Sequence, residues 1–168
     1  NSKIKYENHL SLLVDIMKDD AVNKIKKCNS LKQLYNYLIS FPTIGRFLGY
    51  QYSIDINYSH LTNFDENEFV VAGPGALRGI EKAFKNVNFE PEQIIKYLTE
   101  NQALLSKQAG YMFNGLKGRN LKLIDVQNLF CEFDKYTRVL PSAETIDNQS
   151  KKRIKQLFKA NIEPIDYV

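Results

Sequence analysis

The sequence predicts an all-α protein, a helical bundle of about seven or eight helices. Apolar residues recur with the spacing of a single helix face along most of the chain. The alternating pattern typical of strands is nearly absent, and residues 68–71 are the one candidate strand. The eight glycines and five prolines gather at a few turns, as expected between helices.

The composition favours a single globular domain over residues 1–168, with DNA or another polyanion as a compatible partner because the net charge is +4. A start at Asn1 rather than Met predicts a trimmed chain or a piece of a longer protein. No apolar run reaches the roughly 20 residues that span a bilayer, and no signal peptide is visible. The two cysteines and two histidines lack zinc-site spacing. We therefore expect an intracellular protein without metal, cofactor or membrane contact.

Four helices are expected in the N-terminal half, over residues 4–18, around 22–25, from 31 and from about 44 to 57. Ser30 is a suitable N-cap for the third of them, and Pro42 stops it. The third helix carries an apolar stripe at positions i, i+3, i+4, i+7 and i+8, namely Leu31, Leu34, Tyr35, Leu38 and Ile39.

Residues 58–75 are polar and irregular, apart from a short apolar run before the first glycine. Helices are then expected over residues 76–85, from Pro91 onward and over residues 123–138, with Pro91 at the first helical position. A short basic helix is expected near residues 151–159.

Residues 41–49 (FPTIGRFLG) read as a tight turn between two helices. Gly45 opens the second helix, whose first N–H groups and positive dipole end together form an anion site. Arg46 adds a full charge there. We predict that a DNA phosphate binds Thr43, Ile44, Gly45 and Arg46. The alternative is an ordinary helical corner in which Ile44 packs inward.

A second glycine-rich segment, at residues 73–79, also precedes a helix. Gly73, Gly75 and Arg78 form a plausible second phosphate cradle. The segment is not a P-loop, because no Gly-Lys-Ser/Thr follows, so kinase machinery would lie outside these residues. The alternative is a tight turn in which Gly79 permits close helix packing.

A polar face of the helix around residue 50 suggests a base pocket. Gln51, Asp55 and Tyr58 share this face by their i, i+4, i+7 spacing. A carboxylate among aromatic and amide groups can hold a base edge or support a cationic transition state. Alternatively, Asp55 caps or pairs with a neighbour and the tyrosines belong to the core. The predicted pocket residues are Tyr50, Gln51, Tyr52, Asn57, Tyr58 and, from a later helix, Asn128.

The helix over residues 123–138 has a polar stripe at Asn128, Glu132 and Lys135. Glu132 and Lys135 either form a surface ion pair or share a cleft with Asp55, where two carboxylates can divide acid and base roles. Asp55, Glu132 and Lys135 are therefore the candidate catalytic residues. Cys131 is interpreted as a packed apolar side chain rather than a nucleophile.

Residues 41–49 resemble the hairpin of the helix-hairpin-helix DNA glycosylases, in which an apolar residue, Pro, Gly, an apolar residue and Gly precede a helix. Thr43 stands at the first glycine position. In that family an aspartate follows a later apolar run and drives base excision. This chain departs there, because Gly73 follows the run at residues 69–72 and Asp65 lies in an acidic loop.

Three longer blocks, residues 41–58, 70–79 and 123–138, resemble the glycosylase-like helical domain of DNA base-hypermodification proteins. That group includes the helical domain of 5-hydroxymethyl-dUMP DNA kinases and the alpha-glutamyl/putrescinyl thymine pyrophosphorylases. The resemblance implies a helical, DNA-glycosylase-like fold and action on pyrimidine bases in DNA.

Two functions are compatible with these features. In the first, the domain binds duplex DNA, flips a modified pyrimidine toward Asp55 and cleaves or transfers at the base. In the second, it is a non-catalytic DNA- or modified-base-binding module, fused to or associated with a catalytic partner, and the missing aspartate favours this reading. A helical protein-interaction bundle without nucleic acid is the third option.

Overall fold

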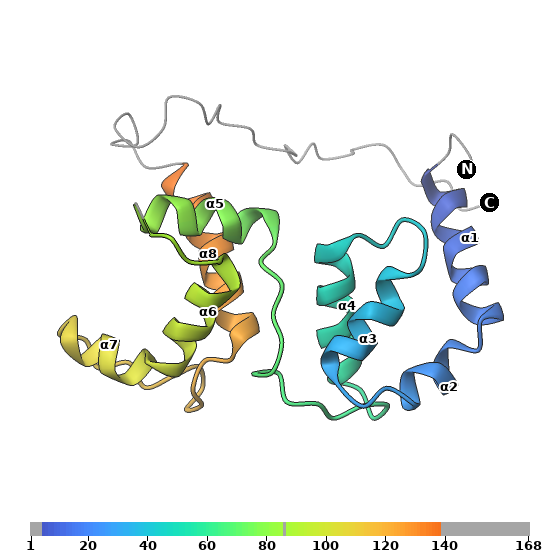
Figure 1. The fold of residues 1–168 in the computed structure, drawn as a ribbon, viewed down its shortest axis with the longest axis horizontal. Helices are drawn as coiled ribbons and strands as arrows, with labels where there is room; N and C mark the ends of the chain where they lie inside the picture. The colour runs from blue at the N-terminus through green and yellow to red at the C-terminus, as the bar shows by residue number, and fades with distance from the viewer. Residues whose placement is uncertain (1–4, 86, 139–168) are drawn as a thin grey trace, which may run out of the picture.

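The computed structural model describes residues 5–85 and 87–138, and over these ranges the protein is all-helical, with eight helices and no strand. This confirms the predicted fold class. Figure 1 shows two groups, α1 to α4 on one side and α5 to α8 on the other, joined by an extended segment. The helices are α1 Lys5–Lys18, α2 Ala21–Lys26, α3 Leu31–Ile39, α4 Arg46–Asn57, α5 Pro74–Ala83, α6 Pro91–Glu100, α7 Gln102–Gln108 and α8 Leu123–Thr137.

The first group is built on the pairing of α3 with α4. Ser30 caps α3 as predicted, because the backbone N–H of Gln33 donates to the Ser30 hydroxyl oxygen at 3.2 Å. Gly49 lets the two helices approach closely, since a Cβ atom at this position would collide with the side chain of Ile39. A small core between α2 and α3 contains Ala21, Ile25, Leu34 and Leu38.

The second group is built on the pairing of α5 with α8, against which α6 also packs. Gly79 of α5 lies directly on the α8 backbone, because a Cβ atom there would collide with the carbonyl oxygen of Phe130. The packing role that the sequence offered for Gly79 is confirmed. Pro74 is the first residue of α5, so this helix begins two residues before its predicted start.

The segment between the two groups is part of the hydrophobic core and contacts helices of both groups. Val70, Val71 and Ala72 are buried in one cluster with residues of α3, α4, α5, α6 and α8. The candidate strand at residues 68–71 is not formed in the described structure. The N–H of Ala72 instead donates to the carboxylate of Glu92 at 3.0 Å. An extended, buried segment thus satisfies a backbone donor with a side chain rather than with a neighbouring strand.

Two expectations concern the ends and the surroundings of the chain. The basic helix expected near residues 151–159 lies outside the described residues. Among the described helices, none combines the length and the apolar character needed to cross a bilayer.

Thr43 → Gly is expected to stabilise the protein. Thr43 has a φ of +73°, a left-handed conformation that costs an L-residue about 1–2 kcal/mol. Glycine removes this strain. Part of the stabilisation is lost again, because glycine raises the conformational entropy of the unfolded chain, which costs roughly 0.5–1 kcal/mol. We expect a net gain of about 0.5–1 kcal/mol, measured by thermal unfolding. Thr43→Ala, which keeps the Cβ atom, should stay near the wild type, and a less stable glycine variant would contradict the strain.

Candidate nucleic-acid interface

The hairpin before α4 leaves a helix start open to solvent. Gly45 is the N-cap, no side chain caps the helix, and the first helical bond runs from the N–H of Gly49 to the carbonyl of Gly45 at 2.8 Å. A Cβ atom on Gly45 would meet no heavy atom within 4 Å. Arg46 and Thr43 are exposed, whereas Ile44 is buried. Ile44 therefore anchors the turn, and Gly45 and Arg46 are the groups that an external anion can reach.

The start of α5 lies beside the start of α4. Gly73 is the N-cap of α5, again without a side-chain cap. Its Cα faces the aromatic ring of Phe47 in the first turn of α4, with which a Cβ atom would collide. Figure 1 shows the two helix starts next to each other at the junction of the two groups. Two uncapped helix N-termini therefore present their positive dipole ends in one region.

Gly75 follows within the first turn of α5 and faces α8. A Cβ atom at Gly75 would lie 3.1 Å from the sulfur of Cys131, so this glycine has a packing role. The side-chain amide of Gln127 donates to the same sulfur at 3.3 Å. Cys131 thus occupies a packed position, as expected from the sequence.

Three buried polar atoms near this junction have no partner among the described residues. They are the hydroxyl of Tyr50, Nε2 of Gln51 and Oε1 of Gln127. Burial, together with the nearby Glu66 carboxylate, raises the pKa of Tyr50 well above its ordinary value. Tyr50 and Gln51 were predicted as pocket residues, but Gln127 was not. Its position between Leu123 and Phe130 on the apolar stripe of α8 is the signal that could have revealed it.

The other predicted pocket residues lie in different surroundings and make different contacts. Asn57 clamps the loop after α4, since its Nδ2 donates to the carbonyl of Phe64 at 2.9 Å and its Oδ1 accepts from the N–H of Phe64 at 2.8 Å. Asn128 is exposed and accepts from Gln127 at 3.2 Å. Tyr52 is exposed and borders a groove beside α1.

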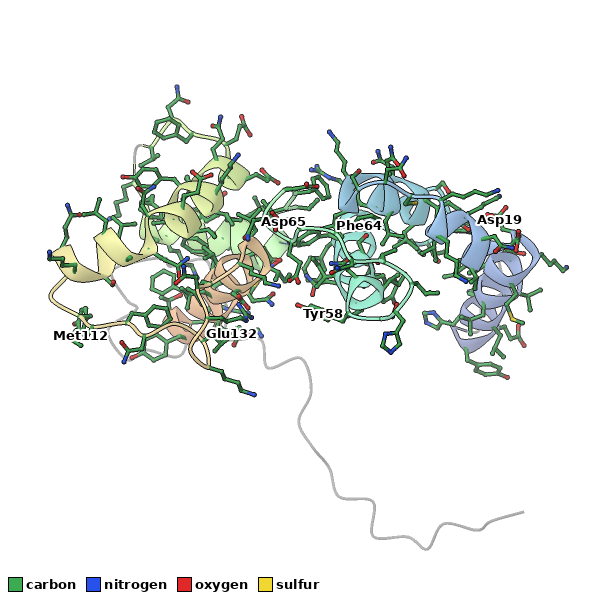
Figure 2. All side chains as sticks on the ribbon, turned by 90° about the horizontal axis from the view of Figure 1, so that it is seen from below. Asp19, Tyr58, Phe64, Asp65, Met112 and Glu132 are labelled. Atoms are coloured by element: carbon green, nitrogen blue, oxygen red, sulfur yellow. The ribbon has the colours of Figure 1, made fainter. Side chains whose placement is uncertain are left out.

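Tyr58 belongs to a polar cluster between the two helix groups. Its hydroxyl donates to Glu66 at 3.2 Å, and Lys122 donates to the same carboxylate at 2.6 Å. Burial and the adjacent Glu66 carboxylate raise the pKa of Tyr58 to about 12. Figure 2 shows Tyr58, Phe64 and Asp65 where the groups meet, with Asp19 and Met112 at opposite ends of the molecule. Glu66 is buried, and no local pattern in the sequence predicts this burial.

The candidate catalytic residues lie in separate grooves. Asp55 borders a groove of about 400 Å³ between α1 and α4, together with His9 and Tyr52. Glu132 borders a groove of about 600 Å³ formed by α6, α7, α8 and the loop between α7 and α8. Glu132 also forms an exposed ion pair with Lys135 at 2.6 Å. The structure therefore does not bring the two carboxylates into a common cleft.

Asp65, the carboxylate nearest to the excision position of the glycosylases, is exposed in the loop before the buried segment. One of its oxygens accepts the N–H of Asn67 at 2.9 Å, which closes a local turn. This hydrogen bond stabilises the local loop conformation.

Together, the helical fold and the paired helix starts define an all-α domain with a candidate anion-binding surface. The chain belongs to the family of the 5-hmdU DNA kinase helical domain, whose model matches residues 1–145. This confirms the resemblance to DNA base-hypermodification proteins at the level of that domain. No curated protein and no solved structure gave a significant match.

Proposed function

We propose that this chain is a DNA-binding module of a base-modification system. It docks on duplex DNA through the starts of α4 and α5 and receives a modified pyrimidine base. The observation that carries this proposal is the side-by-side arrangement of two glycine-capped helix starts in a domain of the 5-hmdU DNA kinase helical-domain family. Arg46 directly follows Gly45, and Arg78 lies five residues after Gly73. The glycosylase-like mode of docking is part of the proposal.

The chemistry of the helix starts suits a phosphate diester. The first N–H groups of a helix point outward and carry the positive end of the dipole, so they favour an anion. The missing side chain at Gly45, with open space around its Cα, lets phosphate oxygens approach the backbone. Arg46 is exposed at the first position of α4 and adds a charge-assisted donor.

The buried amides supply complementary groups for a base edge. Gln51 lies one helical turn after Phe47, which touches Gly73, and Gln127 lies one turn before Cys131, which touches Gly75. Each amide therefore lies one helical turn from a residue that contacts the Gly73 to Gly75 segment. Gln51 offers an unpaired donor and Gln127 an unpaired acceptor. A uracil-type base has an adjacent carbonyl acceptor and N–H donor on its pairing edge, so this pair of amides supports recognition of a flipped pyrimidine.

The module is favoured over a base-cleaving or base-transferring enzyme for two structural reasons. Asp55 and Glu132 face different grooves, so neither has the other as an acid–base partner. Gly73 stands after the buried apolar run, where the glycosylases carry their aspartate. A domain that holds the base for chemistry performed elsewhere accounts for both features.

Arg46→Gln is expected to flatten the salt dependence of DNA affinity. The slope of log K against log salt is negative, and each lost phosphate contact lowers its absolute value, which is the slope meant below, by about 0.9. Binding of a fluorescent duplex containing 5-hydroxymethyluracil, titrated at several salt concentrations, measures this slope. Lys96→Gln, an equal charge change at an exposed site on α6, is the matched control and should keep the wild-type slope.

The same duplexes separate the module from its alternatives. We expect tighter binding to the 5-hydroxymethyluracil duplex than to the thymine duplex, and an unchanged nucleoside composition by mass spectrometry after incubation. If the wild-type protein releases or alters the base and Asp55→Ala abolishes this activity, the domain is an enzyme and not a binding module. Absence of duplex binding at low salt would overturn the proposal and leave a protein-interaction bundle.

A further inference from the structure

One buried carboxylate on α8 gathers three cations around it. The side chain of Asp134 is 1% exposed. Lys82 Nζ lies 2.8 Å from Oδ1, while Arg78 Nη2 at 3.0 Å and Arg138 Nη2 at 3.2 Å lie near Oδ2. Arg78 Nε also donates to Oδ2 at 3.1 Å. Three positive charges and one negative charge leave a net charge of +2 at the contact of α5 with α8.

The fold does not require three cations beside one carboxylate. One cation neutralises a buried carboxylate, and two more cations repel the first and each other. The negative end of the α8 dipole favours Arg138 at the helix C-terminus, but it does not account for Arg78 and Lys82 on α5. The cluster is therefore built in a way that favours an additional anion.

The cations remain accessible from outside. The side chains of Arg78 and Arg138 are 52% and 28% exposed, whereas that of Lys82 is 13% exposed. Arg78 uses Nε and Nη2 on Asp134, and a guanidinium group has five N–H donors, so further donors are available for a ligand. Asp134 holds the Arg78 guanidinium in one orientation, which suits the planar, paired-donor recognition of a phosphate.

We infer that Arg78, Lys82 and Arg138, held in place by Asp134, form a second backbone-phosphate site for DNA, in which Asp134 is a positioning residue. This inference rests on the proposed function and adds Lys82, Arg138 and Asp134 to it. Arg78 lies five residues after Gly73, about 7 Å along α5. The second site thus shares helix α5, whose start belongs to the proposed docking region.

The test compares the salt dependence of duplex binding for Arg138→Gln, Arg138→Lys and the Lys96→Gln control. Loss of one phosphate contact should lower the slope by about 0.9 in Arg138→Gln, whereas Arg138→Lys keeps the charge and should keep most of the slope. Arg78→Gln combined with Arg138→Gln should lower the slope by about 1.8, twice the single value. Circular dichroism and the thermal midpoint establish that each variant is folded at the assay temperature.

The outcomes separate this inference from the proposed function. If Arg46→Gln lowers the slope while both Arg138 variants keep it, the cluster is a structural ion network and the inference is wrong. The same conclusion follows if Arg138→Gln lowers only the thermal midpoint. If the wild-type protein binds no duplex, the proposed function and the inference are both overturned.

Discussion

Gly79→Ala is expected to destabilise the protein by about 3 kcal/mol. A Cβ atom at Gly79 would collide with the carbonyl oxygen and carbon of Phe130 in the α8 backbone. Backbone atoms cannot rotate out of the way as a side chain can, so α5 and α8 must separate. The separation loosens the packing of Ala76 and Ile80, which are buried against α8. Thermal unfolding should show a midpoint lower by about 6–12 °C.

The matched control for Gly79→Ala is Gly45→Ala. Gly45 has an ordinary backbone conformation, with φ at −78°, and open space around its Cα. Its replacement puts alanine at an N-cap, where glycine is preferred, and should cost no more than about 1 kcal/mol. If the two variants unfold at similar temperatures, Gly79 does not lie against the α8 backbone as described.

The helices were predictable because their signals are local. The apolar stripe of α3, its Ser30 cap and the stop at Pro42 lie within a few residues of one another, and the structure places α3 at Leu31–Ile39. Pro91 likewise begins α6. The start of α5 was misplaced by two residues because Pro74 was assigned to the preceding turn, although proline suits the first helical position.

The candidate interface was predictable only in part. The glycines and arginines of the two helix starts stand out in the sequence, but their proximity depends on the contact between Phe47 and Gly73. Asp134 reads locally as one more charge on a polar helix. Its partners Arg78 and Lys82 are 56 and 52 residues away, so no spacing rule links them. Glu66 and Lys122 are also 56 residues apart. The prediction that Asp55 and Glu132 share a cleft had no such long-range contact to support it.

Asp134→Asn is expected to destabilise the protein by about 3 kcal/mol, because it leaves Lys82 nearly buried beside two further cations without a counter-charge. Glu100→Gln, which alters an exposed carboxylate 3.8 Å from Lys96, is the control and should change the stability by less than about 0.5 kcal/mol. Chemical unfolding at pH 7 measures both. Equal stability of Asp134→Asn and the wild type would show that the three cations do not depend on this carboxylate.

The pH dependence of unfolding gives a sharper signature of the same group. Burial by itself raises the pKa of Asp134, but the hydrogen bonds from Lys82 and Arg78 outweigh it and hold the pKa below the ordinary value of 3.8. A carboxyl group whose pKa is lower in the folded state stabilises the protein above its unfolded pKa and loses this contribution as the pH falls through the folded value. The stability difference between wild type and Asp134→Asn should therefore be constant above about pH 5 and shrink in acid below pH 4. A stability difference that grows toward low pH would mean that Asp134 is protonated more readily in the folded protein than in the unfolded one. That result would contradict the ion pairs with Lys82, Arg78 and Arg138.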